Sequence, residues 1–212
     1  HRASIRWKEG RYYLNSNPAS IANSLNKMES VLVVSAGNQG LKYVNSPATW
    51  ATAEDSNGNL LMGGKMLIAG GWDSARKDVH RASNKAGHIC IKVTAVGCDD
   101  KYRTSQFYIM APMWTYGANK RSNGDGYKTV GGTSYAAPQI SGAVAIVKQM
   151  WPQMKGESIA QLLLQTANKD IPNYDPNRHG QGLLDLDKAT QPIFADNIPK
   201  VGRGDGTNVV IS

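Results

Sequence analysis

The chain is poor in the features that mark membrane spans, zinc sites and disulfide scaffolds. No stretch approaches the ~18 consecutive apolar residues that a membrane-spanning helix needs. Cysteine occurs only twice and histidine four times in 212 residues, and two cysteines are too few for a structural zinc site. The length suits one substantial hydrophobic core and does not require two. We therefore expect one globular domain without a membrane span.

Acidic residues are also scarce, 16 against 24 Lys and Arg, which gives a formal net charge of +8. A nucleic-acid-binding protein more often shows a basic stripe with interleaved aromatic residues. Here the basic residues are scattered along the chain. We therefore expect no nucleic-acid partner, and we interpret the charge as a solvated basic surface that favours acidic partners.

The two cysteines, Cys90 and Cys98, are separated by seven residues. This spacing fits a disulfide across a hairpin. A disulfide is expected if the protein is exported, and two buried free thiols if it is cytosolic. The spacing alone leaves both interpretations open.

Two carboxylate pairs, Asp99-Asp100 and Asp185-x-Asp187, lack the spacing of a calcium-binding loop. They are interpreted as solvated turns. We expect no metal site and no cofactor, and no motif supports a structural calcium ion.

The hydrophobic pattern alternates between strands and helices and so predicts an α/β fold. Unbroken apolar runs at 31–34 and 65–72 indicate strands buried on both faces, as in a mostly parallel sheet covered by helices. Apolar residues at helical spacing predict further helices at 18–28 and 157–168. The helix expected at 136–151 is apolar almost all round, which predicts a position in the middle of the domain.

The remaining segments are expected to be loops and short strands. Residues 41–65 are polar and Gly/Asn-rich, which indicates a long loop. The segment 90–110 alternates enough to suggest two short strands with a turn at 99–101. Residues 191–212 have a loop-like composition and are expected to form a peripheral tail or the start of a following segment.

Ser134 lies where a glycine-rich loop enters the apolar helix. A serine hydroxyl is a poor nucleophile unless a base removes its proton. At a helix N-terminus, however, backbone N–H groups and the macrodipole favour the negative charge that develops during attack on a carbonyl. Taken alone, Ser134 is better explained as a helix N-cap.

The full string Gly132-Thr133-Ser134-Tyr135-Ala136-Ala137-Pro138 resembles the nucleophile motif of the subtilisin (subtilase) family. Further matches follow the family's chain order and extend the resemblance over about residues 17 to 190; they are Ser35 to Asn38 after an apolar strand, the turn at 83–87, Met110-Ala111-Pro112 and the segment 180–185. Within the family, the chain resembles the passenger proteases of bacterial autotransporters, which often carry a cysteine pair near the position of Cys90 and Cys98. The resemblance implies a three-layer fold with a mostly parallel central sheet.

The resemblance also implies roles for individual residues. Ser134 would be the nucleophile, and the side-chain amide of Asn38 would stabilise the oxyanion. Ser35, Ala36 and Gly37 would line one wall of the S1 pocket, and Gly132 and Thr133 would contact the substrate. The substrate would be a polypeptide, the pair Cys90 and Cys98 would form a disulfide, and the protein would be secreted, periplasmic or at the cell surface.

Two residues depart from the family's pattern. The glycine that usually follows Ala-Pro is Met113 here, and the histidine that often follows the proline of the nucleophile motif is Gln139. Neither position takes part in proton transfer. We therefore expect a change in local loop geometry and not in the reaction.

The general base and the carboxylate that orients it are missing from the expected places. In this family both precede the oxyanion asparagine, in an Asp-Thr/Ser-Gly turn and a His-Gly-Thr helix, and neither motif occurs before Ser35. His80, His88, His179 and Asp73 lie after Asn38 and receive no catalytic role. We interpret residues 1–190 as the C-terminal portion of a catalytic domain that is incomplete in this chain, with the Asp and His on an upstream segment or chain. A catalytically inactive binding or scaffold module is the main alternative, and an unconventional base is a third.

Overall fold

The computed structural model describes residues 5–8, 11–14, 19–87, 93–94, 97–98, 102–121, 124–192, 201–202 and 208–209. Side chains are described for most of these residues. Those of the strands before residue 15, of β6, β7, β11 and β12, and of positions 19, 26, 119–121 and 124–125 are not.

A parallel sheet forms the centre of the fold. Its middle strand β4 (Met66–Asp73) pairs in parallel with β3 (Leu32–Ser35) and with β8 (Tyr108–Pro112), and its last two residues pair antiparallel with β5 (Asp78–Val79). Every residue of β4 before Asp73 is buried. The buried strand expected at 65–72 is therefore confirmed.

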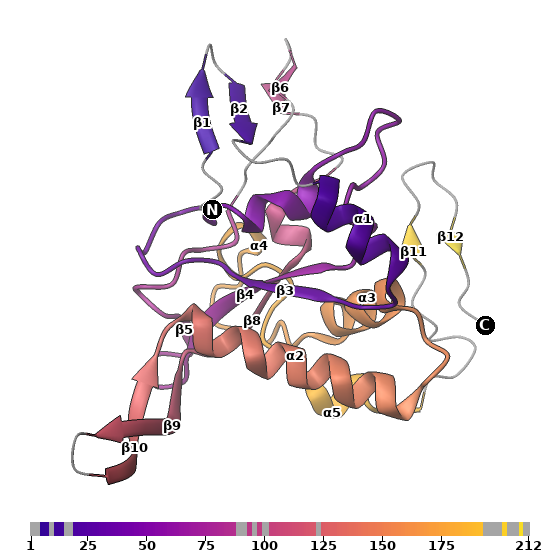
Figure 1. Cartoon of the computed structure of the whole chain (residues 1–212). Coiled ribbons are helices and arrows are strands. Elements are labelled where there is room, and N and C mark those ends of the chain that lie inside the picture. The colour runs from indigo at the N-terminus through magenta and orange to yellow at the C-terminus, as the bar shows by residue number, and fades with distance from the viewer. Residues whose placement is uncertain are drawn as a thin grey trace.

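Alternation of side chains along β4 and β8 supplies one hydrophobic core on each face of the sheet. Ile68 and Met110 belong to the core that contains α1 (Ala19–Lys27) and the 3-10 turn Ala48–Thr52; Ala69 and Ile109 belong to the core formed with α2 (Thr133–Met150) and α3 (Gly156–Thr166). Figure 1 shows α1 and α2 on opposite sides of the sheet. The expected three-layer α/β fold is confirmed.

The shorter elements surround this frame. They are the hairpin strands β1 (Ile5–Lys8) and β2 (Arg11–Leu14), β6 (Val93–Thr94) and β7 (Gly97–Cys98), the 3-10 turn Thr104–Gln106, the helices α4 (Pro176–His179) and α5 (Leu186–Ala189), and the pair β11 (Val201–Gly202) and β12 (Asn208–Val209). The long loop expected at 41–65 is present, with its 3-10 turn. The turn expected at 99–101 lies outside the described residues.

Two expectations of complete burial were wrong. β3 is only half-buried, because it pairs with β4 alone among the described strands and so forms an edge of the sheet. Helix α2 buries one face, through Ala136, Ile140, Ala143 and Val147, and exposes Ile146 and Met150 on the other. In the shorter helix α1, Ala22 and Leu25 are buried and Ile21 is exposed, as is Met28 just after the helix.

An extended hairpin was not anticipated from the sequence. Its strands β9 (Trp114–Arg121) and β10 (Gly124–Gly131) pair with each other along their whole length. Figure 1 shows this hairpin projecting from the sheet and helices, beside the start of α2. Asn123-Gly124 and Asp125-Gly126, both common hairpin turn dipeptides, were the signal that could have identified it.

Candidate active site

Ser134 is the second residue of α2 and is exposed. The chain reaches it through Gly132, whose φ of 143° is available to glycine and strained for other residues. The Gly132 N–H donates to the carbonyl of Met113, 3.0 Å away. This bond fixes the nucleophile loop to the end of β8, so that Ser134 stands at a helix N-terminus as the sequence predicted.

Asn38 lies directly against this loop. The backbone N–H of Thr133 donates to Asn38 Oδ1 at 2.8 Å, and the Thr133 hydroxyl donates to the same oxygen at 3.0 Å. A backbone N–H can only donate, so the atom that it contacts must be the side-chain oxygen. Asn38 Nδ2 has no hydrogen-bond partner among the described residues and remains available as a donor.

The strand end that precedes Asn38, residues 35–37, lies next to Thr133. Ser35 is the last residue of β3, and Ala36 is fully buried with its N–H donating to the carbonyl of Ala69. The Gly37 N–H donates to Thr133 Oγ1 at 3.3 Å. The structure thus brings Ser35, Ala36, Gly37 and Asn38 together with the loop at 132–134, although these segments lie far apart in the sequence.

The amide side chains of Asn84, Gln39 and Asn45 form a hydrogen-bond network around the loop that contains Asn38. Buried Asn84 accepts from the N–H groups of Gln39 and Leu41 at 3.1 and 3.0 Å, and donates to the carbonyl of Ala36 at 3.1 Å. Gln39 Oε1 in turn accepts from Asn45 Nδ2 at 2.6 Å and from the Asn38 N–H at 3.1 Å. The sequence pointed to the turn at 83–87 only by resemblance and gave Asn84 no function.

The two departures from the family pattern strengthen contacts around the nucleophile. Met113 is buried and covers Gly71 of β4, where an added Cβ would lie 2.8 Å from its sulfur. Gln139 Nε2 donates to the carbonyls of Pro112 and Tyr135 at 2.9 and 2.8 Å. The Gln139 side chain therefore ties the end of β8 to α2, and the Met113 side chain packs on β4.

No described histidine is hydrogen-bonded to Ser134. His179 is buried; its Nδ1 accepts from the Asp175 N–H at 3.0 Å, so its Nε2 carries the proton donated to Asp78 Oδ1 at 2.8 Å. His80 Nδ1 accepts from the N–H of Ala82. Asp73 accepts the N–H groups of the turn that follows it. His88 lies outside the described residues.

Asp78 is the centre of a charged cluster formed with Arg178 and His179. Burial raises the pKa of this carboxyl, but hydrogen bonds from Arg178, His179 and the Val79 N–H outweigh burial and lower the pKa to about 2. The cluster therefore joins β5 to α4 through an ionised carboxylate, and its role is structural.

The structure describes only some of the residues considered for a metal site or a disulfide. It contains no group of three or more His, Cys, Asp or Glu side chains arranged to hold a metal ion. Asp185 caps α5 by accepting the N–H of Lys188. Asp99, Asp100 and Cys90 lie outside the described residues, and so does the side chain of Cys98. No described helix combines the length and the hydropathy that a membrane span requires.

Comparison with known proteins agrees with the fold and the site. The chain matches the subtilase family over residues 7–183. It is 27% identical over 162 residues to Subtilisin BL and to Subtilisin Savinase of Lederbergia lenta, covering 74% of this chain and 59% of each relative. It is 28% identical over 171 residues to a thermostable alkaline protease of Halalkalibacterium halodurans, covering 80% of this chain and 37% of the relative.

Solved structures show the same fold. The prenylagaramide maturation protease PagA superposes with a TM-score of 0.57 at 19% identity, covering 80% of this chain and 53% of that one. The PatG macrocyclase, solved in complex with a peptide, superposes with a TM-score of 0.57 at 18% identity, covering 88% and 48%. The chain thus spans less than two thirds of the length of these relatives. With a family match over most of its residues, the chain belongs to the subtilase family.

Proposed function

We propose that this chain is the nucleophile-bearing, C-terminal part of a serine endopeptidase catalytic domain. The observation that carries the proposal is the placement of Ser134 at a helix N-terminus beside Asn38, whose side-chain oxygen is occupied by Thr133. The Asn38 amide and the Ser134 N–H would then donate to the oxyanion that forms when Ser134 attacks a peptide carbonyl. Ser35, Ala36 and Gly37 would contact the residue on the acyl side of the cleaved bond.

Peptide hydrolysis by this route also needs a general base and a group that orients it. We propose that both lie on an upstream segment of the intact protein, or on a separate chain. The fold supports this proposal in two places. β3 has a free outer edge among the described strands, and the outer face of α2 exposes Ile146 (41%) and Met150 (48%). A strand and a helix of the upstream segment would cover these surfaces and bring the base to Ser134.

The alternative is an inactive module that keeps the subtilase fold for binding. It is favoured by one observation, since no described histidine contacts Ser134. The two functions differ in the reactivity of the Ser134 hydroxyl in the intact protein. We propose the enzyme, exported to the periplasm, the cell surface or the medium, because the Thr133 to Asn38 contacts orient a donor that a binding module does not need.

A fluorophosphonate probe tests the proposal. The intact protein, with the upstream segment, should form an adduct at Ser134, and the Ser134→Ala variant should not. Ser141→Ala is the matched control, because Ser141 is another exposed serine of α2 and only donates to the carbonyl of Ala137. The isolated chain should label little, since no described histidine is hydrogen-bonded to Ser134. An intact protein that remains unlabelled at Ser134 would establish the inactive module.

A further inference from the structure

The β9–β10 hairpin carries a row of exposed aromatic side chains that are not part of the candidate active site. Trp114 is 54% exposed, Tyr116 72% and Tyr127 64%. Trp114 and Tyr116 are two residues apart on β9, so both point to one face of the hairpin. Tyr127 lies on the same face from β10, because it is diagonal to Tyr116 in the pairing register. We call this hairpin, residues 114–131, the arm.

The three aromatic rings are fixed by contacts within the arm and at its base. The rings of Tyr116 and Tyr127 stack with centroids 5.7 Å apart and planes at 19°. The Trp114 ring lies across Gly131, where an added Cβ would come within 2.4 Å of it. Its edge meets His80 at a centroid distance of 5.9 Å. A rigid, exposed aromatic surface of this kind is typical of an interaction site.

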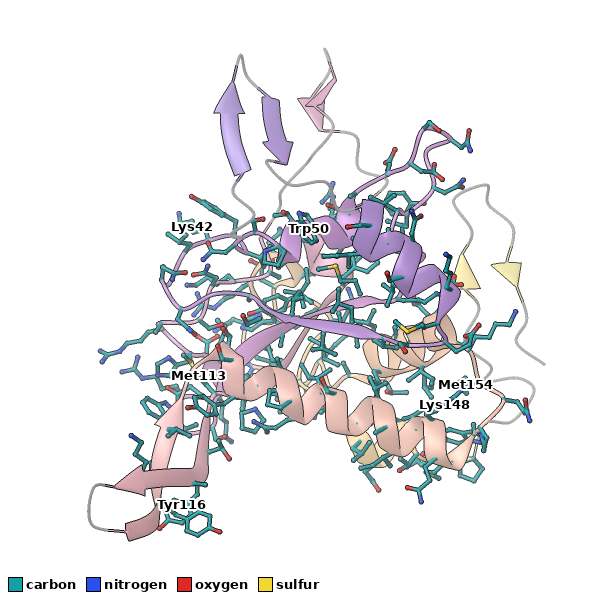
Figure 2. The ribbon with its side chains drawn as sticks, viewed as in Figure 1. Lys42, Trp50, Met113, Tyr116, Lys148 and Met154 are labelled. Carbon is teal, nitrogen blue, oxygen red and sulfur yellow. The ribbon has the colours of Figure 1, made fainter. Side chains whose placement is uncertain are left out.

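The base of the arm is continuous with the nucleophile loop. β10 ends at Gly131, and the next residue, Gly132, is bonded to the carbonyl of Met113 just before β9 begins. Figure 2 shows Met113 beside the start of α2 and Tyr116 further along the arm. The aromatic row therefore starts at the base of the arm, three residues before Ser134 in the chain.

The position of the arm relative to Asn38 indicates which side of a substrate it faces. A Cβ added at Gly132 would lie 3.4 Å from Asn38 Nδ2. The N–H of Gly132 donates to the carbonyl of Met113, at the base of the arm. The wall at 35–37 meets this loop at Thr133, through the Gly37 N–H, whereas the arm joins the loop at Gly132. If the acyl side of a peptide contacts that wall, its leaving side can extend along the arm.

The charged residues and the free backbone edges of the arm indicate the kind of ligand that it would bind. The arm contains Lys120, Arg121 and Lys128 against one acidic residue, Asp125. Its two strands pair only with each other among the described strands, so each has a free backbone edge for an extended peptide. At about 3.3 Å per residue, the five residues from Tyr127 to Gly131 match about five residues of extended peptide.

We propose that the arm binds the leaving side of an extended polypeptide substrate, with aromatic or apolar side chains on Trp114, Tyr116 and Tyr127 and acidic residues next to the basic ones. This inference rests on the proposed function for the nature of the ligand, and it concerns a surface outside the catalytic residues. The arm would thus select substrates by residues that follow the cleaved bond.

Peptide binding to the intact protein carrying Ser134→Ala tests the proposal, because this background cannot cut the peptide. The probe is a fluorescent dodecapeptide with alternating tyrosine and glutamate in its C-terminal half. Fluorescence anisotropy gives its Kd. The double substitution Tyr116→Ala with Tyr127→Ala should weaken binding about tenfold. A peptide with glycine and serine in that half should bind weakly to both proteins, with little difference between them.

Tyr43→Ala is the matched control, since Tyr43 is 49% exposed and belongs to a different segment; it should leave the Kd unchanged. The proposal is wrong if the double variant binds the dodecapeptide as tightly as its parent. It is also wrong if gel filtration shows that the parent is a dimer and the double variant a monomer, since the occupant is then a second copy. Fluorophosphonate labelling of Ser134 in the double variant with Ser134 intact should be unchanged. If the proposed function is wrong, Ser134 is not labelled. If the arm does not bind the substrate, the double variant has the same Kd for the dodecapeptide as its parent.

Discussion

Thr133 donates two hydrogen bonds, from its backbone N–H and its hydroxyl, to the single side-chain oxygen of Asn38. The two residues come from different secondary-structure elements, one from the start of α2 and one from the loop after β3. With its oxygen held in this way, the Asn38 side chain has only its Nδ2 amide left to present. The contact therefore decides which end of the amide faces a substrate.

Replacement of Asn38 should remove an oxyanion donor. We expect Asn38→Ala to lower the rate of peptide hydrolysis by the intact protein by roughly 10²–10³ in kcat, with little change in KM. Asn38→Asp should be at least as harmful, because it keeps the acceptor for Thr133 and places a negative charge beside the oxyanion. Gln149→Ala, at an exposed position of α2, is the control. Equal kcat in Asn38→Ala and the parent would contradict the assignment.

The hydroxyl of Thr133 should contribute through Asn38 and not by contact with the substrate. Thr133→Val keeps the N–H bond to Asn38 but removes the hydroxyl that also accepts from the Gly37 N–H. We expect kcat to fall about tenfold, which corresponds to about 1.4 kcal/mol of transition-state stabilisation. Thr133→Ser should restore most of the rate. A fall in Thr133→Ser as large as in Thr133→Val would show that packing, and not the hydroxyl, matters here.

Asn84 should stabilise the fold more than an exposed asparagine does. Asn84→Ala removes the acceptor for two backbone N–H groups and the donor to the Ala36 carbonyl in a buried position. We expect the free energy of unfolding to fall by about 1–3 kcal/mol. Urea denaturation measures this change, with Asn57→Ala in the exposed loop as control. A loss of less than about 0.5 kcal/mol, the size of a typical surface substitution, would contradict the prediction.

The cluster around Asp78 predicts a loss of stability in acid. Its pKa of about 2 lies below the ordinary value of 3.8, since the bonds from Arg178 and His179 outweigh burial. A carboxyl with a lowered folded-state pKa contributes stability that is present above its unfolded-state pKa and is lost as the pH falls through the folded-state value. The melting temperature should therefore drop between about pH 4 and pH 2.

The variant Asp78→Asn should be less stable at neutral pH by about 1–3 kcal/mol, because the charge-assisted bonds are weakened. Its melting temperature should depend less on pH between about pH 4 and pH 2 than that of the parent. Asp170→Asn, at an exposed position, serves as the control. An Asp78→Asn protein with the pH profile of the parent would exclude this role for the cluster.

The outer face of α2 should be covered in the intact protein. If the proposed upstream segment packs on this face, Ile146→Asp buries a carboxylate and should lower the free energy of unfolding of the intact protein by more than about 2 kcal/mol. The control is Ala75→Asp, at an exposed position in the turn after β4 and away from α2. If the face remains in solvent, both variants should stay within about 0.5 kcal/mol of the parent.

The sequence predicted those features that depend on local pattern. The run at 65–72 forms a fully buried strand, and α3 begins within one residue of the predicted helix. Ser134 and Asn38 were brought together by resemblance and chain order, and their proximity in the fold agrees with that pairing. Their catalytic roles stay predictions.

Features that depend on tertiary neighbours were not accessible in this way. The composition of α2 is apolar on all sides, but burial also requires something to cover each side, and one face has no cover in the described chain. The arm alternates as a hairpin does, yet nothing in that pattern says that its aromatic face stays in solvent. The role of the Asn84 amide likewise depends on its hydrogen bonds to backbone groups that lie far from it in the sequence.

The outer edge of β3, which is free among the described strands, has a consequence for handling the chain on its own. An uncovered strand next to an exposed apolar helix face is a template on which a second molecule can add its own strand. The net charge of +8 opposes such association through mutual repulsion, and added salt weakens that repulsion. The isolated chain should therefore aggregate as the ionic strength rises. Aggregation should decrease when the strand of the proposed upstream segment pairs with the edge of β3.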